Sequence, residues 1–287
     1  MFNFLSCLKS VLSVGIALTV NGVFVISAAQ STPQNDCVAQ MKVAVNAINA
    51  NPKDASAFYK RGLAYGCLTS QEVLTAVGKS RDSVKTKTPV DQDVSAVEIL
   101  RQLKSEGVSA EKAIVDFSHA IKLNPKYKEA YLARALSYLT KGIGIDMESP
   151  EFDQTNKKAL ADLNRVILLD SNNSQAYKER ALIRLHFEEF DLSIADYTKA
   201  IMLSPNQYKL YEARGSAYYW KGMESFEKQD FQRSVKDITK AIGLATDPRV
   251  LSSLHDQRAD SYALMEDKVN EATDRKKAEE LEKAKKP

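Results

Sequence analysis

The sequence predicts an all-α fold of stacked helical hairpins, and three observations support this prediction. A five-residue pattern that begins with arginine occurs five times, at Arg61, Arg134, Arg180, Arg214 and Arg258. A second pattern alternates with it and begins at Ala113, Ala159, Ser193 and Ser234. The distance from the second pattern to the next arginine pattern is 21 residues in three cases and 24 in the fourth. Such internal repetition indicates an array of small units, each packed on the next.

Both patterns have the spacing of helices. In the second pattern, Ile194, Tyr197 and Ile201 are apolar at intervals of three and four residues, as on one face of a helix. Prolines follow the expected second helices at positions 52, 125 and 205, and a residue before proline avoids the α region. The distance from the arginine pattern to the next second pattern varies from 13 to 52 residues. The turn within a hairpin is therefore expected to accept insertions.

The first helix of each hairpin resembles that of the tetratricopeptide repeat. It opens on an aromatic residue, has Gly or Ala four residues later and usually Tyr three residues further; Arg184 is the departure. The opening aromatic residues are Phe58, Tyr131, Tyr177 and Tyr211. Residues 174–207 fit the 34-residue period without a gap. The resemblance covers roughly residues 36–265 and implies a right-handed helical-hairpin solenoid whose first helices line a concave groove.

The expected elements follow in order along the chain. They are a capping helix in 30–53, repeat one in 54–127, repeat two in 128–173, repeat three in 174–207, repeat four in 208–249, and a C-terminal repeat helix with a charged helical tail in 250–287. Insertions fall between the helices of repeats one and two, at 69–107 and 143–157, and the first contains an amphipathic segment over 91–105. In repeat four we expect the helices themselves to be longer. These insertions are either solvated loops or an edge that binds a partner.

The N-terminus predicts export. Residues 11–26 are an uncharged, largely apolar run that follows Lys9 and precedes Ser27 and Ala29, the small residues of a signal-peptidase site. We expect residues 1–29 to be a signal peptide cleaved after Ala29, which directs the protein to a periplasm or to secretion. An uncleaved N-terminal anchor is the alternative.

Two cysteines follow this segment and predict a disulfide. Cys37 lies 15 residues before Pro52 and Cys67 lies 15 residues after it, on two helices expected to run antiparallel. Both thiols therefore fall at the same end of this hairpin. A Cys37–Cys67 bond would stabilise the fold by roughly 3–4 kcal/mol in the chain-entropy model. Two free buried thiols are the alternative.

The repeated arginines recur together with aspartates at one place in the second helices. We interpret them as structural ion pairs between neighbouring helices rather than as a ladder that binds anions. The residues concerned are Arg61, Arg134, Arg180 and Arg214, with Asp116, Asp162, Asp196 and Asp237.

No pattern in the sequence predicts an enzyme, a cofactor or a metal centre. His119, His186 and His255 lie in different repeats without the spacing of metal ligands. The acidic stretch 146–153 lacks the ligand order of a calcium loop. A net charge of +3 with 44% apolar residues does not favour nucleic acid as a partner, nor a membrane once the signal is removed.

By the resemblance, the inner face of the first helices would bind a protein partner. The expected groove residues are Tyr59, Leu63, Leu132, Leu136, Lys178, Leu182, His186, Lys209, Glu212, Tyr219 and Trp220. This mixed aromatic, aliphatic and charged surface suits an extended peptide or a helix. Family members that bind chaperone tails carry an asparagine where this chain has Leu63, Leu136 and Leu182, so that ligand is not expected. For Tyr219 and Trp220 packing against the longer helices of repeat four is an equal alternative.

The predicted function is that of a scaffold or assembly adaptor for proteins. Two other hypotheses remain at this stage. One is a structural envelope protein tethered by an uncleaved N-terminal helix, and the other is a carrier of a small ligand or metal in the groove. The identity of the partner and the oligomeric state do not follow from the sequence.

Overall fold

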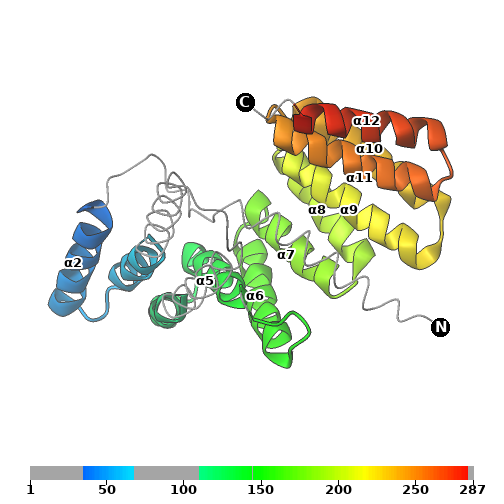
Figure 1. The fold of residues 1–287 in the computed structure, drawn as a ribbon. Coiled ribbons are helices and arrows are strands. Elements are labelled where there is room, and N and C mark those ends of the chain that lie inside the picture. The colour runs from blue at the N-terminus through cyan, green and yellow to red at the C-terminus, as the bar shows by residue number, and fades with distance from the viewer. Residues whose placement is uncertain (1–34, 68–109, 144, 284–287) are drawn as a thin grey trace. The chain divides into compact units, whose positions relative to one another are not determined.

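The computed structural model describes residues 35–67, 110–143 and 145–283 (Figure 1). Within these ranges the regular elements are helices and no strand occurs, which confirms the all-α prediction. Contacts divide the chain into two units, Met1–Leu169 and Asp170–Pro287. The predicted insertion 69–107, with its amphipathic segment 91–105, and the predicted signal peptide lie outside the described residues.

The described part of the first unit contains α2 (Asn35–Ala50), followed by helices over residues 55–67 and 110–123. It continues with α5 (Lys128–Gly142) and α6 (Pro150–Leu169), which pack against each other. Ser149 Oγ accepts a hydrogen bond from the Phe152 backbone N–H at the start of α6. The segment 143–157, expected as an inserted loop, is therefore helical from Pro150 onward.

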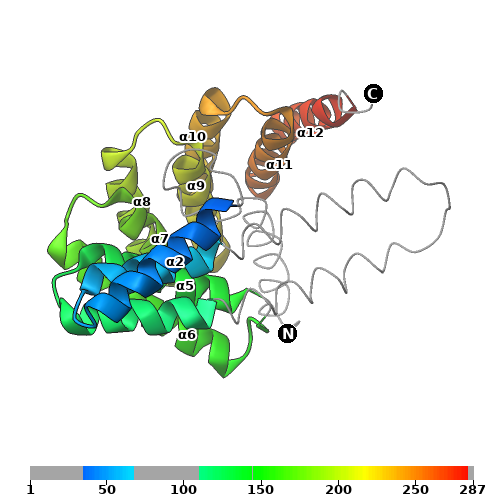
Figure 2. The same cartoon turned by 90° about the vertical axis from the view of Figure 1, so that its left-hand side faces the viewer.

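The second unit contains three consecutive hairpins. They comprise α7 (Ser174–His186) with α8 (Phe190–Leu203), α9 (Tyr208–Ser225) with α10 (Lys228–Leu244), and α11 (Pro248–Leu264) with α12 (Lys268–Lys283). Each helix packs on the next one in the chain, as Figures 1 and 2 show. Asn173 caps α7 by accepting a hydrogen bond from the Ala176 N–H, and Asp247 caps α11 in the same way from Arg249. Such caps satisfy backbone donors that the helix leaves unpaired.

The core contains one large side chain from each of four second helices, at the position directly after the repeated aspartate. Phe117, Leu163, Tyr197 and Ile238 hold this position and are all buried. The facing position directly after the repeated arginine is always small. At Gly62 the approach is so close that an added Cβ would lie 2.5 Å from Cε1 of Phe117. This small-to-large contact between helices explains the Gly or Ala of the repeat pattern.

Residues 268–283, expected as part of a charged helical tail, form the second helix of a fifth hairpin within the described part of the chain. Asp274 and Ala278 of α12 are buried against α11, and Ser252 Oγ donates a hydrogen bond to the Ala278 carbonyl. Arg275 stands in the core position that other repeats fill with Phe, Leu, Tyr or Ile. Because this last helix carries few apolar residues, its repeat pattern is hard to recognise in the sequence.

Candidate protein-binding surface and the ion pairs behind it

The repeated arginines and aspartates meet in bidentate pairs between the two helices of each hairpin. In every pair Nε and Nη2 of the arginine donate to the two carboxylate oxygens. The N–O distances are 2.7 and 2.6 Å for Arg61–Asp116, 2.8 and 2.7 Å for Arg134–Asp162, 2.8 and 2.7 Å for Arg180–Asp196, and 2.7 and 2.8 Å for Arg214–Asp237. The structure thus brings together the eight residues that the sequence singled out, and it places the aspartates in the interior.

Three of the five repeated arginines, Arg258 among them, also reach the preceding hairpin. Their free Nη1 donates to a hydroxyl two residues after the preceding repeated aspartate. The bonds are Arg134 to Ser118 at 2.9 Å, Arg214 to Thr198 at 3.0 Å and Arg258 to Thr239 at 2.8 Å. One guanidinium therefore links three helices, so it joins neighbouring repeats as well as the two helices of its own.

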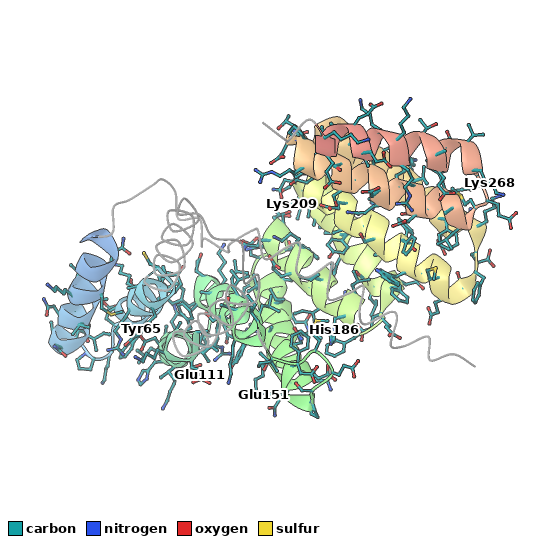
Figure 3. All side chains as sticks on the ribbon, in the orientation of Figure 1. Tyr65, Glu111, Glu151, His186, Lys209 and Lys268 are labelled. Atoms are coloured by element: carbon teal, nitrogen blue, oxygen red, sulfur yellow. The ribbon has the colours of Figure 1, made fainter. Side chains whose placement is uncertain are left out.

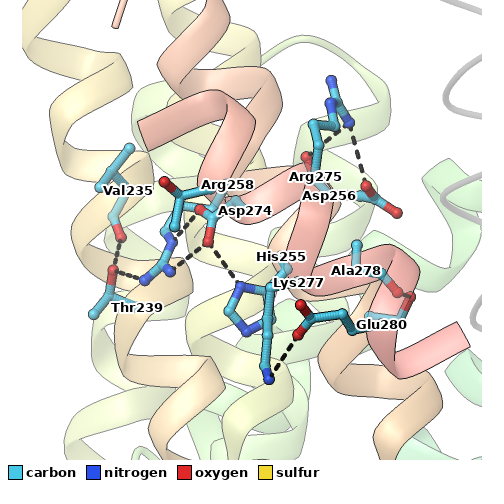
Figure 4. Close-up of polar contacts among 12 residues, drawn as sticks. Val235, Thr239, His255, Asp256, Arg258, Asp274, Arg275, Lys277, Ala278 and Glu280 are labelled. Carbon is cyan, nitrogen blue, oxygen red and sulfur yellow. Dashed lines mark hydrogen bonds and ion pairs between the residues drawn. The ribbon is translucent and has the colours of Figure 1, made fainter. Parts of the chain in front are cut away.

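The fifth pair, Arg258–Asp274, is one that the sequence reasoning missed. Asp274 accepts hydrogen bonds from Arg258 at 2.7 and 2.8 Å and lies 2.8 Å from Nδ1 of His255. Figure 4 draws these contacts as dashed lines. Burial acts to raise the pKa of Asp274, but the hydrogen bonds from Arg258 and His255 outweigh it and hold the pKa below its usual value. A signal was available, because an Ala follows Asp274 by four residues, as it follows Asp116, Asp196 and Asp237.

In the first unit, the expected groove residues largely take part in packing. Tyr59 lies against the rings of Phe117 and Tyr127, with centroid distances of 5.8 and 5.0 Å, and burial raises its pKa to about 12. Leu63 packs on the same core as Phe117, Leu136 is buried and Leu132 is half-buried. Of this set only Leu136 is buried, and Tyr59, Leu63 and Leu132 stay half-buried.

In the second unit, α7 and α9 contribute the remaining expected residues. Lys209 is exposed on α9, whereas Lys178, Leu182 and His186 of α7 are half-buried (Figure 3). Trp220 packs on the core cluster that contains Ala181 and Ala217. Its ring meets Tyr219 edge-on at 5.4 Å, and Tyr219 in turn contacts Phe231 of α10 at 5.9 Å. Both rings therefore have a packing role and remain partly accessible.

Two carboxyl groups of α7 and α9 are shielded from solvent, Glu179 almost completely and Glu212 in part, and the sequence predicted a site role for Glu212 alone. Glu179 of α7 is 1% exposed, and burial raises its pKa although the Lys178 ammonium 2.9 Å from Oε1 acts in the opposite direction. Burial also raises the pKa of Glu212, partly offset by the Gln257 side-chain amide that donates to Oε1 at 3.1 Å. Burial, and then the charges of Glu179, Asp196 and Glu212, raise the pKa of Tyr197. A helical Glu is normally solvent-exposed, so the sequence offers no sign of the burial of Glu179.

Of the two cysteines in the predicted disulfide, the side chain of Cys67 alone lies within the described part of the chain. Cys37 belongs to α2, but its side chain is outside the described part of the chain. Cys67 ends the described part of helix 55–67 and is disulfide-bonded. The pairing of these two cysteines therefore stays a prediction.

The described residues contain neither a cluster of metal-ligand side chains nor a candidate membrane-spanning helix. No group of three or more His, Cys, Asp or Glu side chains in this part of the chain could hold a metal ion. His119 instead stacks on Phe58 with ring centroids 4.4 Å apart. None of the helices described is both long and apolar enough to cross a membrane.

These features define a helical-hairpin repeat protein with a mixed polar and aromatic surface on its first helices. Residues 215–248 match the family model described as tetratricopeptide repeat. Human tetratricopeptide repeat protein 13 is 30% identical over 126 residues, which are 44% of this chain and 14% of that protein's length. The chain thus has the tetratricopeptide-repeat architecture that the sequence predicted.

Solved structures of low identity share this fold. The crystal structure of YrrB, a TPR protein with an unusual peptide-binding site, gives a TM-score of 0.55 at 14% identity, covering 84% of this chain and 93% of YrrB. A crystal structure of MamA gives 0.53 at 19% identity, covering 65% and 96%. MamA from Desulfovibrio magneticus RS-1, from residue 41 onward, gives 0.52 at 17% identity, covering 70% and 100%. At these identities the likeness concerns the fold alone.

Proposed function

We propose that the protein is a scaffold that binds a peptide or helix of a partner protein on the α7 and α9 surface of its second unit. One observation carries this proposal. Half-buried Leu182 lies on α7, and α9 carries both half-buried Trp220 and the exposed ammonium of Lys209. Partly exposed aromatic and aliphatic side chains with a charged rim are the usual anchors of peptide ligands.

The surface suits a ligand with both apolar and acidic side chains. Leu182 and Trp220 offer apolar contact, and Lys209 offers a donor for a carboxylate. Glu179 and Glu212 already have partners within the protein, since Glu179 lies 2.9 Å from the Lys178 ammonium and Glu212 accepts a hydrogen bond from Gln257 at 3.1 Å. A tetratricopeptide-repeat protein with a peptide-binding site, YrrB, supports the choice of a peptide as ligand. The proposed role is one of binding and assembly, without catalysis or a cofactor.

Affinity capture with the tagged full chain tests this proposal. A partner retained by the wild type is expected to bind the Leu182→Asp/Lys209→Glu variant about tenfold more weakly or worse, since a charge enters the apolar contact and a donor is reversed. Circular dichroism melting shows whether the variant is folded. Lys240→Glu repeats the Lys209→Glu charge reversal at an exposed position of α10 and is expected to leave binding unchanged. Equal binding by both variants would contradict the assignment of the surface.

We further propose that the protein is exported, with a mature chain that begins at Gln30 and carries a Cys37–Cys67 disulfide. The apolar run 11–26 followed by small residues supports cleavage, and an oxidising compartment favours the bond. Intact-mass measurement on non-reduced protein from its native compartment is expected to show loss of residues 1–29 and no alkylation before reduction. A retained N-terminus would contradict cleavage after Ala29, and two alkylated thiols would contradict the bond.

A further inference from the structure

The α9–α10 hairpin projects beyond both of its neighbours at one edge of the second unit. Aligned on the repeated arginine, α9 starts level with α7 but has 18 residues against 13. When the second helices are aligned on the repeated aspartate, α10 starts three residues earlier than α8 or α12. When the first helices are aligned on the repeated arginine, α11 ends at the same position as α7. The extra five residues of α9 correspond to about 7 Å of helix. The tip of this hairpin therefore stands clear of the turns on either side.

Phe226 occupies the tip in a conformation that phenylalanine rarely adopts. Its φ is 59° and its ψ is 20°, the left-handed region, and the side chain is 79% exposed. The turns of the flanking hairpins also have one left-handed residue each, but there it is a glutamate, Glu188 or Glu266. Glycine or asparagine would stabilise such a position, and a solvated phenylalanine contributes no packing. A residue whose backbone conformation is unfavourable and whose side chain does not stabilise the fold indicates a binding role.

Acidic surface with further apolar side chains surrounds this tip. Beside it, an open depression of about 280 Å³ is lined by Glu188, Glu189, Phe190, Asp191, Leu192, Lys221 and Glu224. Leu192 is exposed there, and on the other side of the hairpin Val269 is exposed as well. We define the acidic edge as residues 188–192, 221–228 and 264–269, which contain seven carboxylates and three lysines. Its net charge of −4 by this count is opposite in sign to the +3 of the whole chain.

We propose that the acidic edge is a second docking surface, which takes a basic protein segment with an apolar side chain and uses Phe226 as its anchor. Charge complementarity selects the segment and steers it. The exposed ring of Phe226 and the neighbouring Leu192 then bury the apolar side chain, which is the contact that an aromatic hot spot provides. An anionic membrane surface is disfavoured by the same negative charge. This proposal uses none of Leu182, Lys209 and Trp220, so it is independent of the peptide-binding site proposed above.

Binding of defined peptides to the full chain tests the proposal. The probe is a fluorescent 15-residue peptide of lysine and leucine in amphipathic order, measured by anisotropy; lysine–serine and glutamate–leucine peptides of equal length are the comparisons. The wild type is expected to prefer the lysine–leucine peptide, with affinity that falls as salt rises. Phe226→Asn is expected to weaken binding about tenfold or more, and Glu224→Gln/Glu227→Gln severalfold.

The Phe226→Asn variant separates binding from folding. Asparagine tolerates the left-handed conformation, so the melting temperature is expected to stay equal or rise while the affinity falls. Met202→Ser, at an exposed residue in the last turn of α8, is the matched control and is expected to bind like the wild type. Unchanged binding by Phe226→Asn, equal weakening by Met202→Ser, or preference for the glutamate–leucine peptide would each overturn the proposal. Self-association that Phe226→Asn abolishes would overturn it in favour of a second copy as the occupant.

Discussion

Replacement of Arg214 by alanine is expected to lower the free energy of unfolding by about 3 kcal/mol, the effect of removing one partner from a buried ion pair. Asp237 would keep a carboxylate whose side chain is 7% exposed and whose two hydrogen bonds to Arg214 are lost. The bond from Arg214 to Thr198 of α8 would be lost too. Urea unfolding followed by circular dichroism measures the change, and hydrogen exchange shows whether α9 and α10 open first.

Two further variants establish the cause of that loss. Arg249→Ala removes an arginine whose ion pair with Asp247 is solvent-exposed, and it is expected to change stability by less than about 0.5 kcal/mol. Arg214→Leu/Asp237→Leu removes both charges and is expected to be more stable than Arg214→Ala, because no unpaired carboxylate stays in the interior. If Arg214→Ala were no more harmful than Arg249→Ala, the pairs would not be structural, and the anion-binding interpretation would return.

The second large effect is expected from one methyl group at Gly62. Gly62→Ala should destabilise the first unit by about 1–3 kcal/mol, the usual range for overpacking. The new Cβ would lie 2.5 Å from Cε1 and 2.9 Å from Cδ1 of Phe117, and Phe117 is completely buried. Since protein encloses the ring on all sides, either the ring or the helix 55–67 must shift. Thermal unfolding of the full chain, with hydrogen exchange of this helix, measures the effect.

Gly243→Ala is the matched control, because it makes the same substitution in a helix with open space around it. No heavy atom lies within 4 Å of the position that its Cβ would take. The higher helix propensity of alanine is expected to stabilise α10 by up to about 1 kcal/mol. Equal effects of the two substitutions would mean that the contact between Gly62 and Phe117 does not limit the approach of the helices.

The sequence predicted the ion pairs of the candidate sites but neither the packing of the expected groove residues nor the conformation of Phe226. Pairing of Arg61, Arg134, Arg180 and Arg214 with aspartates was predictable, because both partners recur at constant positions in every repeat. The packing of Tyr59 and Leu63 against the core was not, because the side chains of neighbouring helices decide how much of the inner face of a first helix is covered. The left-handed conformation of Phe226 was not predictable either, because the position holds neither glycine nor asparagine.

The sequence by itself determined the all-α class, the hairpin repeat and the residues that tie its helices together. These properties depend on local periodicity and on residues that recur at constant spacing, so they can be recognised without coordinates. Tertiary structure alone decided that Glu179 is buried, that α12 completes a fifth hairpin through Asp274, and that Phe226 projects from an acidic edge. Each of these depends on which side chains from different helices meet, and a single helix does not encode the positions of its neighbours.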